Sequence, residues 1–95
     1  MWVELDGPRP AVVLTREVIR QQARHITVAP ISSTARGLST EVLVDAANGL
    51  GEPSVVHCDA IITVPVTALG GQIGHLRPHQ EATLAEAIRT AFGLR

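Results

Sequence analysis

The stretch PHQEATLAEAIRTAF, residues 78–92, is the one segment of this chain with a clear helical pattern. Apolar side chains recur there at helical spacing on one face: Leu84, Ile88, Ala91 and Phe92. A proline at the first position suits the start of a helix, and the glycine that follows suits its end. The pattern predicts a helix at the end of this chain, with one apolar face packed on the rest of the molecule.

The residues before this helix form short apolar runs separated by turn residues. Turns are expected at Asp6-Gly7-Pro8 and around Asn48-Gly49 within residues 46–51. Many short strands followed by one helix predict a mainly β fold, with the helix packed over a small, strongly curved sheet. We predict strands at 2–5, 11–14, 25–30, 41–44, 54–58 and 61–64, and the last two of these could form one bent strand. One or two helical turns are expected within 15–24, a polar loop at 32–39, and a turn followed by a short strand at 68–76.

Length and composition indicate one small globular domain spanning residues 1–95. Hydrophobic residues make up 45% and charged residues 18%, the balance of a folded chain. The net charge of −1 provides no overall basic field, although all eight Lys-or-Arg side chains are arginine, whose planar fork suits phosphate. The one cysteine, Cys58, excludes an internal disulfide and is expected to be a small buried residue. With no membrane-length apolar run and no signal-peptide layout, we expect a cytoplasmic protein.

One arginine, Arg9, stands between two prolines at the start of the most strand-like segment. Proline fixes its own φ and pushes the residue before it towards extended geometry, so the backbone of Arg9 is stiffened from both sides. A stiff backbone suits a charge that must point at a ligand. A tight turn between two strands with an exposed arginine explains the same residues, and these residues alone favour that interpretation.

A cluster of hydroxyl groups lies in APISSTARG, residues 29–37. Ser32, Ser33 and Thr34 come directly after a predicted strand, and Arg36 follows them. Hydroxyls and a guanidinium at a strand end can hold a phosphate oxygen, although the hydroxyls of such loops also cap their own turns. The four histidines show no metal-binding spacing, and the chain has no nucleotide-phosphate loop. We therefore expect no metal and no cofactor.

The order of the motifs is more specific than any one of them. The chain contains, in this order, W-V-E-L, RP-A-V-V-L, T-V-A-P-I-S-S, G-L-x-x-P-S-V-V, I-G-x-L and a helix ending F-G-L. This series resembles the MazF/PemK family of toxin endoribonucleases over nearly the whole chain, and its short actinobacterial members above all. The resemblance implies a small SH3-like curved barrel that works as a homodimer, cleaves single-stranded RNA without metal, and is held inactive by a cognate MazE-like antitoxin.

The resemblance also implies roles for individual residues. The family's RP arginine corresponds to Arg9, and its hydroxyl residue after the A-x-I strand end corresponds to Ser32, where many members have threonine; both are expected to be catalytic. Metal-free RNA cleavage uses the neighbouring 2′-OH as nucleophile, and a permanently charged arginine suits the extra negative charge of the transition state. The general base stays open, with His25 and His57 as candidates. The residues expected to contact RNA are Ser33, Thr34, Arg36, Ser54 and Asp59.

Two other functions compete with RNA cleavage as interpretations of the sequence. A gyrase-inhibiting toxin of the CcdB type shares the fold but engages gyrase through a tryptophan-containing tail, whereas this chain has its one tryptophan at Trp2. A non-catalytic SH3-like module needs an aromatic groove for proline-rich ligands, which a chain with no tyrosine and one phenylalanine cannot build. The sequence favours the ribonuclease. Its cleavage sequence cannot be inferred from relatives, because residues 59–63 depart from the family's usual Glu-Gln-Ile-Arg-Thr.

Overall fold

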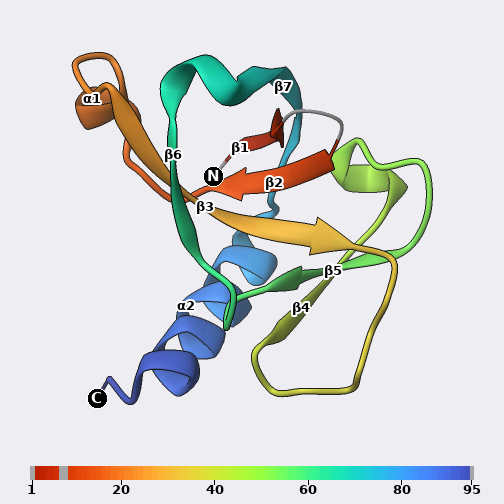
Figure 1. The fold of residues 1–95 in the computed structure, drawn as a ribbon. Helices are drawn as coiled ribbons and strands as arrows, with labels where there is room; N and C mark the ends of the chain where they lie inside the picture. The colour runs from red at the N-terminus through yellow and green to blue at the C-terminus, as the bar shows by residue number, and fades with distance from the viewer. Residues whose placement is uncertain (1, 7–8, 95) are drawn as a thin grey trace.

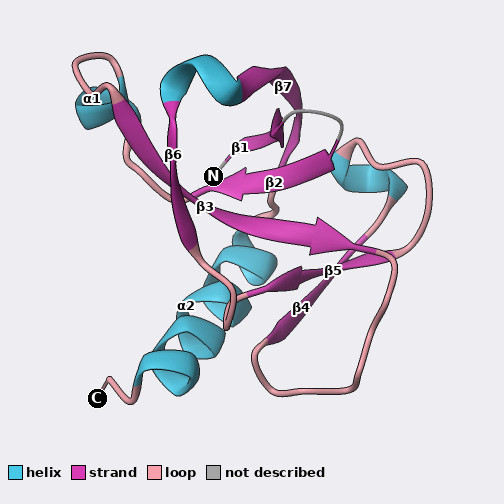
Figure 2. Ribbon diagram, in the orientation of Figure 1, coloured by secondary structure: helices cyan, strands magenta, loops and turns pink. Residues whose placement is uncertain are grey.

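The computed structural model describes residues 2–6 and 9–94, which form a curled antiparallel sheet with one long helix against it (Figure 1). Figure 2 shows that strands form the body of the molecule and that α2 leads away from it towards the carboxyl terminus. The strand order is β4-β5-β3-β2-β1-β7, and β6 pairs with the first half of β3. The elements are β1 (Trp2–Asp6), β2 (Arg9–Val13), α1 (Glu17–Arg20), β3 (His25–Ser32), β4 (Glu41–Val44), the 3₁₀ turn η1 (Ala46–Asn48), β5 (Ser54–His57), β6 (Ile62–Pro65), the 3₁₀ turn η2 (Val66–Ala68), β7 (Leu69–His75) and α2 (Pro78–Phe92).

The central strands are apolar without alternation because both of their faces are covered. In β2, Val12 packs in the core that α2 covers, whereas Ala11 and Val13 pack on the opposite face with Ile26 and Val28 of β3. Cys58 is fully buried, as expected. The core on the α2 side contains Val3, Val12, Ala29, Ile31, Val42, Val44, Leu50, Val56, Cys58, Leu76, Leu84 and Ala87.

The helix α2 has the predicted bounds but buries a different part of its surface. Leu84 and Ala87 lie in the core and Ile88 packs against it, whereas Phe92 is 55% exposed. The expectation that Phe92 packs on the core was wrong, because the last turn of α2 extends beyond the sheet (Figure 1). In the described part of the chain, neither α2 nor any other helix has the length and apolarity to cross a membrane.

Several strand boundaries differ from the expected ones, because pairing extends strands past their apolar residues. Ser32 does not open the polar loop but ends β3, where it pairs with Val55 of β5. Residues 54–64 form two strands rather than one, and both pair with β3. Residues 69–75 form a long strand along β1 in place of a turn and short strand. The turn expected at residues 6–8 falls mostly outside the described residues.

The turn around Asn48 ties the sheet to α2. Gly49 has a left-handed φ of 90°, and a Cβ there would lie 1.9 Å from the carbonyl oxygen of Ile73, so the close approach of η1 to β7 requires glycine. The buried amide of Asn48 donates to Gln80 Oε1 of α2 (2.7 Å) and accepts from Gln80 Nε2 (2.9 Å). Gln80 Nε2 also donates to the carbonyl of Leu43 in β4 (3.2 Å). These bonds fix α2 against the strand that begins at Glu41.

Candidate active site

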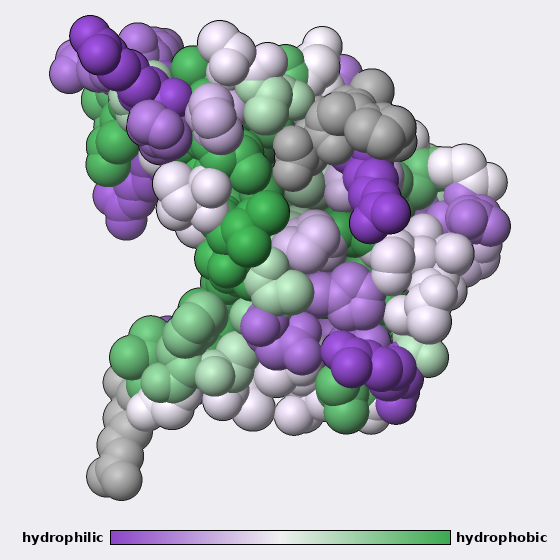
Figure 3. All heavy atoms as spheres, in the orientation of Figure 1, coloured by the Kyte–Doolittle hydropathy of each residue, from purple (hydrophilic) through white to green (hydrophobic). Residues whose placement is uncertain are grey.

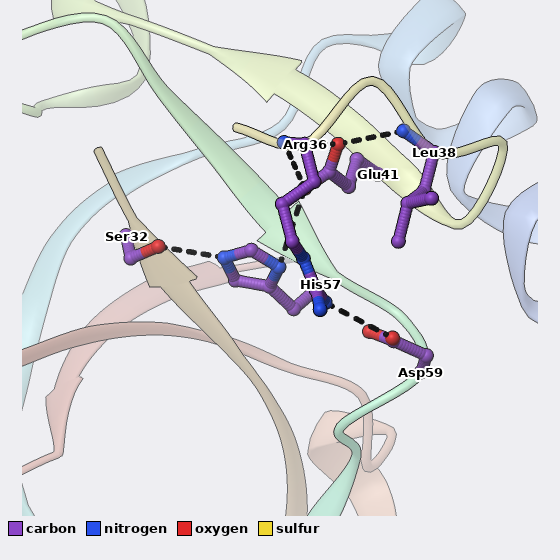
Figure 4. Close-up of polar contacts among 6 residues, drawn as sticks. All are labelled: Ser32, Arg36, Leu38, Glu41, His57 and Asp59. Carbon is purple, nitrogen blue, oxygen red and sulfur yellow. Dashed lines mark hydrogen bonds and ion pairs between the residues drawn. The ribbon is translucent and has the colours of Figure 1, made fainter. Parts of the chain in front are cut away.

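Ser32, the last residue of β3, contacts the side chain of His57, the last residue of β5 (Figure 4). The Ser32 Oγ and the His57 Nε2 are 2.6 Å apart, within hydrogen-bond distance. Ser32 pairs with Val55, two residues before His57, so the two side chains project from the same face of the sheet. The structure therefore joins an expected catalytic residue to one of the two histidines that the sequence left open.

Glu41 lies on the other side of the His57 ring. It is the first residue of β4 and stands opposite His57 in the strand register. Its Oε2 is 3.7 Å from His57 Nδ1, an ion-pair distance when the imidazole is protonated. The side chains of Glu41 and His57 are 4% and 13% exposed, so solvent screens their interaction little. Hydroxyl, imidazole and carboxylate thus follow one another in a row.

Glu41 also binds the backbone of the loop that precedes it (Figure 4). Its carboxylate accepts hydrogen bonds from the N–H of Leu38 (2.9 Å) and from the N–H of Arg36 (3.0 and 3.1 Å). These bonds, that of Leu38 foremost, lower the pKa of Glu41 below its ordinary value of 4.5 against the opposing effect of burial, and the nearby His57 lowers it slightly further. The carboxylate is therefore ionised at neutral pH and ties residues 33–40 to the sheet.

Two residues expected to contact RNA pair with each other on the surface. Arg36 Nη2 lies 3.3 Å from Asp59 Oδ2, and both side chains are well exposed. An exposed ion pair of this kind contributes only about 0–1 kcal/mol. The guanidinium thus lies beside Asp59, two residues after His57 in the chain, and can exchange this partner for an anion.

Arg9 opens β2 at the same end of the sheet where Ser32 closes β3. The ladder between these strands ends at the pair Ala11–Pro30, and Arg9 and Ser32 are each two residues beyond it. Arg9 is exposed, and its neighbour Pro10 lines a hollow of about 470 Å³ together with Ser32. The two expected catalytic residues therefore lie at one end of the sheet, beside one hollow.

The other hydroxyl residues surround this hollow and its neighbour. Ser33 and Ser54 line the first hollow and also a second one, of about 360 Å³, whose walls include Leu43 and Val55. The Ser54 hydroxyl donates to the carbonyl of Glu52 (3.1 Å). Thr34 is exposed in the loop that follows Ser33. Within residues 2–6 and 9–94, no three His, Cys, Asp or Glu side chains are grouped so as to hold a metal ion.

Comparison with known proteins distinguishes between the families that share such a fold. Residues 3–92 match the family model of the PemK-like, MazF-like toxins of type II toxin–antitoxin systems. The chain belongs to this family. The family resemblance read from the motif series is thereby confirmed.

Relatives of this MazF-like toxin match it over nearly their whole lengths. It is 58% identical over 91 residues to Endoribonuclease MazF3 of Mycobacterium tuberculosis, and the aligned region covers 96% of this chain and 88% of that protein. It is 31% identical to the Probable endoribonuclease MazF5 of the same species, over 95% of this chain and 85% of that protein. The solved structure of Mycobacterium tuberculosis toxin MazF-mt6 superposes with a TM-score of 0.96 at 52% identity, covering 100% and 99% of the two chains. The predicted mainly β fold with a C-terminal helix is confirmed.

Sequence reasoning did not find Glu41 in this MazF-like toxin. The strand 41–44 was predicted with its correct bounds. A carboxylate at the first position of a strand is common, however, and did not by itself indicate a functional residue. The usable signal was the strand pairing: when β4 and β5 are aligned as a hairpin on their apolar residues, Glu41 falls opposite His57. That alignment would also have favoured His57 over His25, which is exposed at the start of β3.

Proposed function

We propose that this MazF-like toxin is a single-domain endoribonuclease that cleaves single-stranded RNA at a defined sequence, without a metal ion, in the cytoplasm. The observation that carries the proposal is the 58% identity to Endoribonuclease MazF3 over 96% of the chain. The gyrase-inhibiting and SH3-module alternatives lack any comparable support. The row of Ser32, His57 and Glu41 adds chemistry suited to phosphodiester cleavage.

In the proposed reaction, the 2′-oxygen next to the scissile phosphate attacks phosphorus and displaces the 5′-oxygen of the following nucleotide. The transition state gathers negative charge on the phosphoryl oxygens, and Arg9, the neighbour of Pro10 in the wall of the hollow, supplies a permanent positive charge. Ser32 orients the 2′-OH or the phosphate. Ser33, Thr34, Arg36, Ser54 and Asp59 remain the proposed RNA contacts around this centre.

The proposal is tested by single-turnover cleavage of a long single-stranded RNA in the presence of EDTA. Arg9→Ala is expected to lower the rate by about 10²–10³-fold, the usual loss for one transition-state contact. Arg9→Lys restores little of it, because an ammonium cannot replace a planar fork. The matched control is Arg24→Ala, an exposed arginine just before the opposite end of β3.

The role of Ser32 is tested in the same assay. Ser32→Ala is expected to be severely impaired, whereas Ser32→Thr keeps the hydroxyl and the activity. A substrate with a 2′-deoxy nucleotide at the scissile position should resist cleavage. Cleavage of that substrate would show that the 2′-OH is not the nucleophile, and wild-type rates for both Arg9→Ala and Ser32→Ala would refute the site.

We also propose that the toxin is a homodimer. Figure 3 shows the surface hollowed between the end of α2 and the region of β6, with hydrophobic residues gathered there. Ile62, Phe92 and Leu94 are among the exposed large hydrophobic side chains. An exposed apolar surface of this kind is typical of an interface. Sedimentation at micromolar concentration should show a species of twice the 10.1 kDa chain mass, and a monomer alone would contradict the proposal.

A cognate MazE-like antitoxin is proposed as the second partner, because the family is that of toxins from type II toxin–antitoxin systems. We expect a disordered segment, acidic and apolar, to cover the groove that binds RNA. Inhibition should then be competitive with RNA. Unchanged RNA binding at saturating antitoxin would contradict a shared groove.

A further inference from the structure

We propose that His57 is the proton acceptor of the cleavage reaction and that Glu41 is the residue that positions it. This inference rests on the proposed endoribonuclease function and adds a proton path to it. The resemblance to the family assigned catalytic roles to Arg9 and Ser32 only, and left the general base open.

The geometry of the three side chains defines the path. His57 Nδ1 faces the Glu41 carboxylate at 3.7 Å, so we assign the neutral ring the proton on Nδ1. Nε2 is then free to accept a hydrogen bond from the Ser32 hydroxyl across 2.6 Å. A serine hydroxyl that donates in this way presents its oxygen lone pairs to a further donor. The 2′-OH of RNA in the adjoining hollow is such a donor.

The step balances without a further reactant. As the 2′-oxygen forms its bond to phosphorus, its proton passes to Ser32 Oγ while the Ser32 proton passes to His57 Nε2. The P–O5′ bond breaks, and the leaving 5′-oxygen takes a proton from water. His57 becomes an imidazolium, and it returns its proton to solvent after the products leave.

Glu41 favours this transfer by its charge and its fixed position. The carboxylate cannot turn away, because the backbone N–H groups of Arg36 and Leu38 hold it. It therefore stands beside His57 as a preorganised negative charge that stabilises the imidazolium as it forms. Other charged groups at this end of the sheet are Arg36 and Asp59, which pair with each other on the surface, and Arg9 at the start of β2.

A purely structural role for His57 makes a different prediction. A histidine that only packed beside Ser32 would affect folding or the placement of the hydroxyl, and its protonation state would not matter to the rate. A proton acceptor must be neutral before the reaction. The rate of the chemical step must then fall in acid, where the imidazole is protonated.

The experiment is a pH–rate profile under single-turnover conditions, with RNA binding measured separately on a 2′-deoxy substrate. Wild-type toxin should show a falling acidic limb. His57→Ala should lose about 10²–10⁴-fold in rate, the usual contribution of a general base, with the acidic limb gone and RNA binding kept. Added imidazole should restore part of the rate. The matched control, His25→Ala, should keep both the rate and the limb.

The Glu41→Gln variant tests the positioning residue. The side chain keeps its shape but loses the charge that stabilises the imidazolium, so the acidic limb should move to lower pH while the plateau rate falls. Thermal melts identify variants that fail to fold. If wild-type toxin cleaves RNA but folded His57→Ala keeps its rate and limb, the inference is wrong and the proposed function stands. If wild-type toxin cleaves no RNA at all, the proposed function itself fails.

Discussion

The buried amide pair between Asn48 and Gln80 is expected to contribute a large share of the stability of this small toxin. Gln80 makes four hydrogen bonds: two with the Asn48 amide, one to the carbonyl of Leu43, and one from the N–H of Arg77. Gln80→Ala removes all four. Asn48 retains only its bond to the carbonyl of His75 and the bond it accepts from Asp45.

The magnitude follows from these bonds. A hydrogen bond contributes about 0.5–1.5 kcal/mol net, so losing four costs ~2–6 kcal/mol in the free energy of unfolding. Folded domains have a total of only about 5–15 kcal/mol. The loss should therefore be a substantial part of the whole, and it should loosen β4 at Leu43, two residues from Glu41.

Urea denaturation followed by circular dichroism measures this loss directly, with each variant at the same protein concentration because a dimer unfolds in a concentration-dependent way. The matched control is His79→Ala, an exposed neighbour in the same helical turn, for which a change within about 0.5 kcal/mol is expected. A loss below about 1 kcal/mol for Gln80→Ala would refute the reasoning, since it would mean that water replaces the amide without cost.

Three further outcomes are expected. Arg20 forms an ion pair with the buried carboxylate of Glu4, so Arg20→Ala leaves that carboxylate without its partner. The free energy of unfolding should fall by up to about 3–5 kcal/mol in a denaturation experiment, and a change near zero would contradict this. The Cys58 thiol, whose pKa burial raises to about 11, should react with a thiol reagent at pH 8 only as fast as the chain unfolds. Folding lowers the pKa of Glu41, so the stability that its carboxylate contributes is fully present above pH 4.5 and is lost as the pH falls through the lower pKa of the folded state. In that pH range the melting temperature of the wild-type toxin should drop more steeply than that of Glu41→Gln. Parallel curves for the two proteins would contradict this prediction.

The elements of this fold could be predicted where local chemistry decides them. The spacing of Leu84 and Ile88 with a proline and a glycine at the ends gave α2 its bounds, and the apolar run at 11–14 indicated the strand β2. The exposure of Phe92 could not be predicted, because helical spacing does not say where the sheet beneath a helix ends. The extension of β3 to Ser32 likewise depends on a partner strand far away in the chain.

The candidate site was predictable only in part, for a related reason. Arg9 and Ser32 came from the family resemblance, since each residue alone is better explained by a turn or a polar loop. The contact of His57 with Ser32 and Glu41 needs three strands to be paired in one register. An alignment of the β4–β5 hairpin could have placed Glu41 opposite His57, but no spacing in the sequence indicates the pairing of β5 with β3 that brings in Ser32. Functional residues that belong to a motif along the chain are therefore easier to predict from sequence than residues that strand pairing brings together.

One carboxylate links the electrostatics of the site to the shape of its loop. Glu41 holds the backbone at Arg36 and Leu38 by hydrogen bonds, and the same oxygens face His57. Breaking these bonds would leave a buried charge without hydrogen-bond partners, which is far costlier than opening the surface pair of Arg36 with Asp59. An RNA phosphate can therefore displace Asp59 from the guanidinium while the loop stays in place. In the proposed mechanism, substrate binding changes the surface ion pair and leaves the proton path already assembled.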